Sequence, residues 1–441
     1  MLAAATALAL TACRSDPPPA GPRVEIDTIG DTTIVRTSSG SVWAAEARLV
    51  PEVSIGELDG PDEYLFGRIG SLAVDSEGNI YVFDTQASHV RAFDATGTYL
   101  ATLGGKGEGP GEFKRAETIA VLPDGRLLVR DPGNMRVQVF DPESGGTDEW
   151  EYNSGNTYRA GSPLYTDVRG RTFLLTRGHD GDDIILVLGP DGTHLDTLPE
   201  PTTDYEPVVV SAATENASVT SFVPFTPGFY WAVHSSGHFL TGLSSDYRVD
   251  LVLDDGVLRI ERAYDPVPVS GEERDYRRES VVRMVRFTVP DWSWDGPAIP
   301  DQKPVFNELL TGRDGRIWVR LATAGQRVEN ESHDPGDPFS QPVTWEESTR
   351  YDVFESDGSY LGAVAPPDGF RSQPDPVFDG GHVWAVATDE LGVERVVRYR
   401  IEVDDRGGGR FPSETSFAGQ LPSERRVAML PVAWTVRQGV P

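Results

Sequence analysis

The feature that most constrains the fold is a four-strand unit that repeats along the chain. Its clearest copy lies in residues 104–141, where a glycine-rich segment precedes three short runs of alternating or β-branched apolar residues. The runs cover 118–122, 127–130 and 137–141, with Pro-Asp-Gly and Pro-Gly-Asn between them. Such runs predict short strands joined by tight turns. One unit of this size cannot bury its own apolar faces, so further copies are expected.

Turn glycines locate these copies. Five units each carry two of them, namely Gly78 and Gly97, Gly125 and Gly145, Gly170 and Gly192, Gly237 and Gly256, and Gly315 and Gly358. The two glycines lie 19 to 22 residues apart in the first four units and 43 apart in the fifth, which therefore contains an insertion. A sixth, weaker unit begins near Pro376. Four-stranded repeats of about 45 residues are typical of β-propeller blades.

Two sequence marks resemble a known family. The link 104–113 and the run with Asp131, Asn134, Arg136, Val137 and Phe140 resemble the NHL-repeat type of six-bladed β-propeller. Both marks are clear in the first two units, and only the strand–turn–strand rhythm persists in the others. The resemblance implies a fold more than an activity, because such propellers include peptide and nucleic-acid binders, lyases and lactonases.

We therefore predict an all-β fold, a six-bladed β-propeller of four-stranded antiparallel blades over residues 24–410, followed by a tail, 411–441. Residues 46–61 resemble the fourth strand and link of a blade, although they precede the first blade. We expect the strand 46–55 to complete the last blade and close the ring, which removes exposed sheet edges. A seventh, degenerate blade built from both tails is the alternative. Residues 24–42 predict an added hairpin or edge strand.

Three insertions interrupt the repeat, at 199–227, 265–304 and 323–348. The second predicts one helix over 270–287, with Ser270 as N-cap and Glu272 and Glu273 in the first turn. In a four-stranded meander, the blade-to-blade links and the loops between second and third strands lie on the same face. All three insertions fall in these positions, so we expect them to form a wall on one face, called the insertion face below.

The N-terminus predicts a lipid anchor. Residues 1–12 are apolar and lead to Cys13, the single cysteine. The sequence before Cys13 resembles a bacterial lipoprotein cleavage site, which implies removal of 1–12 and a lipid on the thiol. The apolar run is too short to span a bilayer, and residues 13–23 predict a Pro-rich tether. We expect a monomer held in the cell envelope, on the periplasmic or outer-surface side; an uncleaved tail with a buried thiol is the alternative.

The charge limits the partners. The 69 Asp and Glu residues against 39 Lys and Arg give a formal net charge of −30, which disfavours nucleic acid and anionic lipid as partners. We interpret most acidic residues as a solvated surface, with Ca²⁺ sites as the alternative.

Arginines mark a candidate ligand site. Arg68 and Arg115 hold equivalent positions before the first strands of the first two blades. In the third blade, Arg159 lies one residue away from the equivalent position. Guanidiniums at a funnel rim favour a carboxylate or another anion, and salt bridges within this acidic chain are the alternative. Asp84 and Asp131 begin equivalent loops, where we expect them to accept hydrogen bonds from loop amides rather than to bind a metal.

Further candidate residues lie in the insertions. Trp292 and Trp294 are expected to stack on a sugar or peptide or to pack beneath the wall. His333, close to Asp334 and Asp337, is a weak ligand candidate. No metal site is predicted.

Two functional hypotheses follow. The leading one is a non-catalytic scaffold of the cell envelope, without a cofactor, that binds a peptide, glycan or partner protein on the insertion face. The alternative is a Ca²⁺-dependent lactonase or lyase with its site in the central funnel, where carboxylate and amide oxygens would have to converge. Three or more such side chains meeting near the axis would favour the enzyme. No Gly-x-Ser-x-Gly, His-Glu-x-x-His or Cys/His cluster assigns a reaction.

Overall fold

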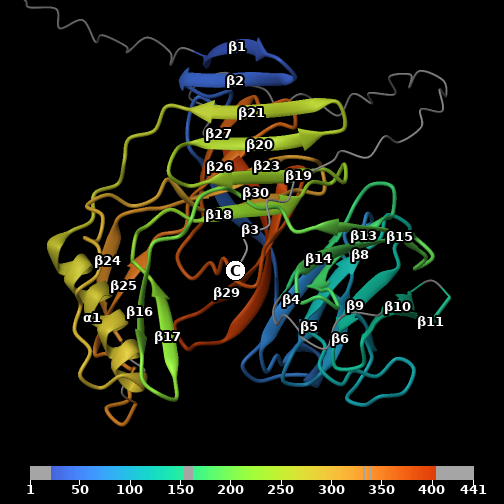
Figure 1. The fold of residues 1–441 in the computed structure, drawn as a ribbon. Helices are drawn as coiled ribbons and strands as arrows, with labels where there is room; N and C mark the ends of the chain where they lie inside the picture. Colours follow the sequence, from blue (N-terminus) through green and yellow to red (C-terminus); the bar gives the residue numbers. More distant parts are fainter. Residues whose placement is uncertain (1–20, 143, 153–161, 331–332, 338, 404–441) are drawn as a thin grey trace, which may run out of the picture. The chain divides into compact units, whose positions relative to one another are not determined.

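The computed structural model describes residues 21–142, 144–152, 162–330, 333–337 and 339–403 (Figure 1). Three four-stranded antiparallel sheets form the first three blades. Blade one contains β4 (Ile69–Val74), β5 (Ile80–Asp84), β6 (His89–Phe93) and β7 (Tyr99–Leu103). Blade two contains β8 (Thr118–Val121), β9 (Leu127–Asp131), β10 (Arg136–Asp141) and β11 (Gly146–Glu151). Blade three contains β12 (Leu164–Thr166), β13 (Thr172–Arg177), β14 (Asp183–Leu188) and β15 (His194–Pro199).

The other three blades belong to two larger sheets. Blade four contains β18 (Phe229–Val233), β19 (Phe239–Leu243), β20 (Arg248–Leu253) and β21 (Gly256–Arg262). Blade five contains β22 (Phe306–Thr311), β23 (Ile317–Leu321), β26 (Tyr351–Phe354) and β27 (Tyr360–Ala365). Blade six contains β28 (Val377–Asp379), β29 (His382–Thr388), β30 (Glu394–Val403) and the N-terminal strand β3 (Ala47–Ile55).

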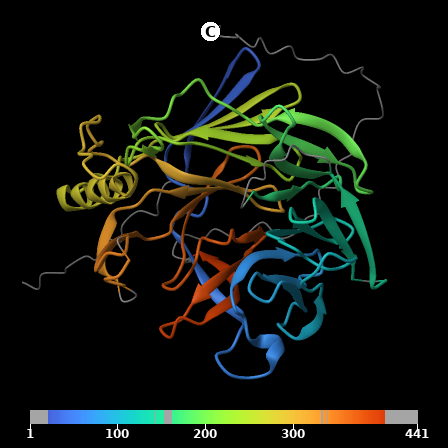
Figure 2. The same ribbon diagram turned by 60° about the horizontal axis from the view of Figure 1, so that its bottom comes forward.

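The N-terminal strand β3 lies antiparallel to β30 as the fourth strand of blade six. Ile55 of β3 packs in one buried cluster with Ile69 of blade one and Trp384 of blade six. The first strands β4 and β28 are also in contact, so the last blade lies beside the first (Figure 2). A short parallel pairing of β3 with β27 joins blades five and six into one sheet.

The core lies between neighbouring blades because side chains alternate along each strand. In β5, Tyr81 and Phe83 pack toward blade two, whereas Ile80 and Val82 pack toward blade six and β3. Neighbouring blades therefore cover both faces of β5 and β9, and neither strand has an exposed residue.

The predicted N-terminal hairpin consists of β1 (Arg23–Ile29) and β2 (Thr32–Ser39). It extends blade four, because β2 lies parallel to the outer strand β21. This hairpin therefore adds to the edge of an existing blade. The tail 411–441 lies outside the described residues.

The predicted helix is α1 (Gly271–Thr288), and Ser270 accepts a hydrogen bond from the Glu273 amide as its N-cap. One short 3-10 helix, η1 (Asp62–Tyr64), precedes blade one. The first and third insertions differ from the loops that we expected, because they form the hairpins β16 (Val209–Ala213)–β17 (Ser218–Phe222) and β24 (Gly325–Glu329)–β25 (Val343–Glu347). No described helix combines the length and apolarity that a bilayer span requires.

Candidate functional site

The three insertions form a common wall, as the strand order predicts. Val210 and Val223 of the first insertion pack with Ile299, Trp292 and Trp294 of the second. Helix α1 contacts both β17 of the first insertion and the β24–β25 hairpin of the third, and Figure 1 shows the two hairpins beside the helix. Towards that hairpin, the Tyr276 hydroxyl lies 3.5 Å from Thr344 Oγ1 and Arg277 Nη2 donates to the Trp345 carbonyl at 3.2 Å.

A buried ammonium joins the parts of this wall. Lys303 Nζ lies 2.7 Å from Glu273 Oε1 and 2.7 Å from Glu347 Oε1, and its side chain is 1% exposed. It also lies over the Phe225 ring at 5.3 Å from the centroid. The carboxylate of Glu273 packs so closely on Gly325 that a Cβ atom there would collide with it. One cation therefore contacts all three insertions.

Backbone hydrogen bonds hold the predicted arginines Arg68 and Arg115 in position. The Arg68 and Arg115 amides donate to the carboxylates of Asp84 and Asp131, which also accept from neighbouring amides. Both aspartates thus bind loop amides, as we expected. The arginine side chains are exposed at the start of the first strands, and their role in ligand binding stays a prediction. Arg159 lies outside the described residues, as does Cys13.

The other predicted residues lie within the wall. Trp292 and Trp294 are partly exposed, with ring centroids 6.2 Å apart, and belong to the apolar cluster beneath β16–β17. His333 lies in the third insertion, with Nδ1 at 2.9 Å from Ser340 Oγ. The structure brings the two tryptophans together, but among the described residues no hydrogen bond, ion pair or ring contact joins them to Arg68 or His333. Their part in ligand binding also stays a prediction.

A polar cluster that the sequence did not indicate lies near the axis, between blades five and six. Glu308 on β22 is opposite Arg320 on β23, and Arg320 is opposite Tyr351 on β26. Residues directly opposite in a sheet share one face, so these three side chains form a row. Gln373 and Asp375 join the row from the segment before β28. We call these five residues the axial cluster.

Hydrogen bonds link the axial cluster. Arg320 Nε donates to Glu308 Oε2 at 2.8 Å. Gln373 Nε2 donates both to Glu308 Oε1 at 3.1 Å and to Asp375 Oδ1 at 2.9 Å. The amide of Gln373 therefore bridges two carboxyl groups that lie 67 residues apart in the sequence.

The electrostatics of the two carboxyl groups are perturbed. Burial raises the pKa of Glu308 to about 7; Arg320 opposes this rise and Asp375 adds to it. Burial of the carboxyl group among its neighbours also raises the pKa of Asp375, although the residue as a whole is exposed to solvent. At neutral pH the pair therefore binds a proton far more readily than two free carboxylates would.

Side chains from two further blades face this cluster. Burial raises the pKa of Tyr165 on β12, and Asp375 and Glu308 raise it further. Burial likewise raises the pKa of Tyr230 on β18; Arg320 lowers this pKa and Glu308 raises it. Blades three and six are not neighbours, so these interactions require the side chains to converge near the axis, where the first strands of adjacent blades meet.

The axial cluster lies next to the wall. Asn307, the neighbour of Glu308, places its Nδ2 3.4 Å from Glu347 Oε2. Both Glu308 and Asp375 lie near the starts of first strands, where the links of the insertion face arrive. Local sequence pattern did not single out Glu308 and Asp375, because acidic pairs are abundant and blades five and six lack the sequence marks of the first two blades. The signal available was the position of polar residues at the starts of first strands.

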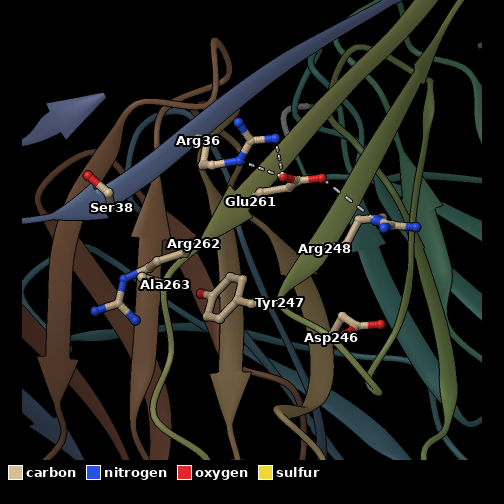
Figure 3. A pocket seen from close by; sticks show the side chains of 8 residues that line it. All are labelled: Arg36, Ser38, Asp246, Tyr247, Arg248, Glu261, Arg262 and Ala263. Carbon is tan, nitrogen blue, oxygen red and sulfur yellow. Dashed lines mark hydrogen bonds and ion pairs between the residues drawn. The ribbon is translucent and has the colours of Figure 1, made fainter. Parts of the chain in front are cut away.

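A cavity of about 400 Å³ lies elsewhere, at the outer edge of blade four (Figure 3). Its charged groups are largely paired with one another. Glu261 lies between Arg36, at 2.9 Å, and Arg248, at 3.9 Å, while Arg262 lies 2.9 Å from the buried Asp352. In Figure 3 the guanidinium of Arg262 points away from those of Arg36 and Arg248, so the three do not surround one point. This cavity marks the attachment of the N-terminal hairpin.

Comparison with known proteins defines the class of fold. The family DUF5128, described as a 6-bladed beta-propeller, matches residues 49–146, which include most of β3, blade one and most of blade two. This description agrees with the six blades above, and the chain is a six-bladed β-propeller. No curated protein matches the sequence.

Several solved structures are similar over most of their length. One is a protein of Bacteroides fragilis provisionally named as exported, with 9% identity and a TM-score of 0.43 over 84% of this chain and 99% of that one. Another is a gluconolactonase of Xanthomonas campestris, with 13% identity and a TM-score of 0.38 over 88% and 99%. A third is the virginiamycin B lyase of Staphylococcus aureus, with 10% identity and a TM-score of 0.34 over 75% and 94%. At these values the similarities carry no argument about activity or location.

Proposed function

We propose that this propeller is a non-catalytic binding protein of the cell envelope that takes a peptide, glycan or partner protein on its insertion face. The observation that carries the proposal is the axial cluster beside the wall. It combines charged and polar side chains from blades five and six, and tyrosines of blades three and four face it. Convergent polar groups with perturbed pKa values are typical of ligand sites on rigid scaffolds.

A binding assay tests this function. Glycan and peptide arrays probed with the whole chain identify a ligand, and titration calorimetry then compares variants. We expect Arg320→Gln and Asp375→Asn to weaken binding at least tenfold, and Arg68→Ala with Arg115→Ala to weaken it less. Glu77→Gln, in the exposed turn between β4 and β5 on the opposite face, is the matched control. Equal losses in the control and the cluster variants would contradict the proposed face.

The proposed location rests on the sequence before Cys13. A lipid on Cys13 would hold the propeller at a membrane surface through the Pro-rich tether. Cys13→Ser should then abolish lipid labelling and leave the precursor unprocessed. Normal lipidation of that variant would refute the anchor.

An enzyme is the second candidate, because a carboxyl group whose pKa is about 7 suits general acid–base catalysis. Glu308, Gln373 and Asp375 also provide two carboxyl groups and an amide, the convergence that a Ca²⁺-dependent propeller enzyme would need. The donor set does not fit Ca²⁺ well, since Gln373 presents nitrogen to both carboxyl groups and Arg320 already neutralises Glu308. Among the described residues, no group of three or more His, Cys, Asp or Glu is suited to a metal. Calcium titration with a lactone-hydrolysis assay separates this candidate from the first.

A further inference from the structure

The axial cluster has both hydrogen-bond donors and hydrogen-bond acceptors without a partner among the described residues. Arg320 uses only Nε within the described residues, which leaves Nη1 and Nη2 without a protein partner. Gln373 uses its nitrogen for both carboxyl groups, so its oxygen is unused, and Asp375 Oδ2 is unused as well. The guanidinium offers two donors on one edge, and the neighbouring loop offers two acceptors.

Tyr351 supplies a second, independent observation. Its side chain is fully buried, and its hydroxyl has no hydrogen-bond partner among the described residues. Burial raises the pKa of Tyr351, and its charged neighbours are Glu308, Arg320 and Asp375. Buried tyrosine hydroxyls nearly always have a partner, so this unpaired hydroxyl beside the cluster is a donor that a ligand atom can satisfy.

The charges indicate the class of ligand. Arg320 contacts Glu308, whereas Asp375 has no cation in contact among the described residues. A ligand ammonium would satisfy Asp375 and the Gln373 oxygen. A ligand carboxylate would accept from the two free nitrogens of Arg320, the geometry in which a guanidinium binds carboxylates best.

We propose that the axial cluster binds a small zwitterion, an α-amino acid or a dipeptide, with its carboxylate on Arg320 and its ammonium on Asp375. This inference rests on the proposed function and selects the peptide class for that same site. Tyr165 and Tyr230 lie close enough to the cluster for its charges to shift their pKa values, and we place the side chain of the ligand on their side of the cluster. A neutral polyol would make fewer charge-assisted bonds with these groups.

Four small probes test this class by saturation-transfer NMR and titration calorimetry on the whole chain. They are glycylglycine, ethylamine, propionate and glycerol. We expect glycylglycine to bind at least tenfold more tightly than the other three, because only it satisfies both ends of the cluster. Arg320→Gln and Asp375→Asn should each weaken glycylglycine at least tenfold, and the Glu77→Gln control should not.

Tyr351→Phe separates a ligand contact from a purely structural role. It should weaken glycylglycine three- to tenfold while the melting temperature stays within a few degrees of the parent. Unchanged affinity in Tyr351→Phe would refute its contact with the ligand. Preferential binding of glycerol that the cluster variants abolish would overturn the zwitterion and leave the proposed function intact. If no probe binds while an array ligand still requires Arg320 and Asp375, the zwitterion class is again wrong and the site stands.

Discussion

Blades two and five carry an arginine at the same position, the fourth residue of the second strand, and use it in opposite ways. Arg130 on β9 is 1% exposed and donates to the carbonyls of Ser162 at 2.8 Å and Leu175 at 3.0 Å. Arg320 on β23 keeps a 26% exposed side chain and donates once, to Glu308. The first arginine holds two blades together, and the second presents free donors beside the axis.

The neighbouring residues explain the difference. In blade two, Asp131 follows the arginine and accepts hydrogen bonds from the amides of Lys114 and Arg115. This contact, called the tie below, joins the end of β9 to the segment that leads into β8. In blade five, Leu321 stands in that place. The tie is made instead by Glu347 of the third insertion, which accepts from the Thr323 amide at 3.1 Å and from Lys303 at 2.7 Å. In blade five a residue of the insertion thus makes the contact that a repeat residue makes in blade two, and the Arg320 guanidinium beside it donates only to Glu308 among the described residues.

The largest expected effect concerns Arg130. Arg130→Met removes donors from two buried carbonyls and a cation from Glu117, which lies 3.9 Å away. We expect the free energy of unfolding to fall by about 3 to 5 kcal/mol, measured by urea denaturation, because buried groups are left unpaired. Arg320→Met is the matched variant and should cost only about 1 kcal/mol, since its partner Glu308 keeps contact with water and Gln373. Equal losses would show that the two positions are equivalent after all.

The second effect concerns Lys303, which contacts Glu347 in the corresponding tie of blade five. Lys303→Met leaves Glu273, whose side chain is 2% exposed, without its cation. We expect a loss of about 2 to 3 kcal/mol and faster proteolysis within 265–304, because the wall loses its common contact. The double variant Lys303→Met with Glu273→Gln should recover part of this loss. If the single variant resists protease as the parent does, Lys303 does not hold the wall together.

The sequence alone predicts the blades, the helix and the face of the insertions, but not the two inserted hairpins. The turn glycines and the strand order predicted the blades, and Ser270 predicted the start of α1. Strand order also placed the three insertions on one face, because that argument needs only the reversal of the chain at each turn. The hairpins β16–β17 and β24–β25 were missed because their alternation is short and lies outside the repeat.

The axial cluster could not be predicted from local pattern. Glu308 and Asp375 meet through ring geometry, in the two blades whose sequence marks have faded, and 69 acidic residues offer no way to single them out. The predicted arginines belong to blades one to three, and the marks are clearest in the first two of these blades. Clear marks accompany structural contacts such as those of Asp131 with loop amides, whereas the axial cluster lies in blades that lack these marks.

A third, smaller effect depends on pH. The folded pKa of Glu308 is raised from 4.5 to about 7, so the folded form holds this proton more tightly than the unfolded form. Its contribution to stability is therefore complete below pH 4.5 and is lost as pH rises through 7. Glu308→Gln should remove this loss, so that its stability relative to the parent improves by about 1 to 2 kcal/mol between pH 5 and pH 8. Parallel stability curves for the two proteins over that range would refute the raised pKa.

The smallest expected effect compares lysine at both positions. Arg320→Lys keeps a cation that can reach Glu308, because the parent side chain uses a single nitrogen there, so stability should change by less than about 0.5 kcal/mol. Arg130→Lys cannot reproduce the planar fork that reaches Ser162 and Leu175 on two separate segments, so we expect a loss of about 1 to 2 kcal/mol. Thermal and urea unfolding measured side by side give both values. Binding adds the sharper contrast, because Arg320→Lys removes the paired donors that the proposed carboxylate requires. A variant that is as stable as the parent but binds glycylglycine several-fold more weakly would locate the difference between the two arginines in their free nitrogens. If Arg320→Lys instead matches the parent in affinity, a point charge suffices at this position and the bidentate contact is wrong.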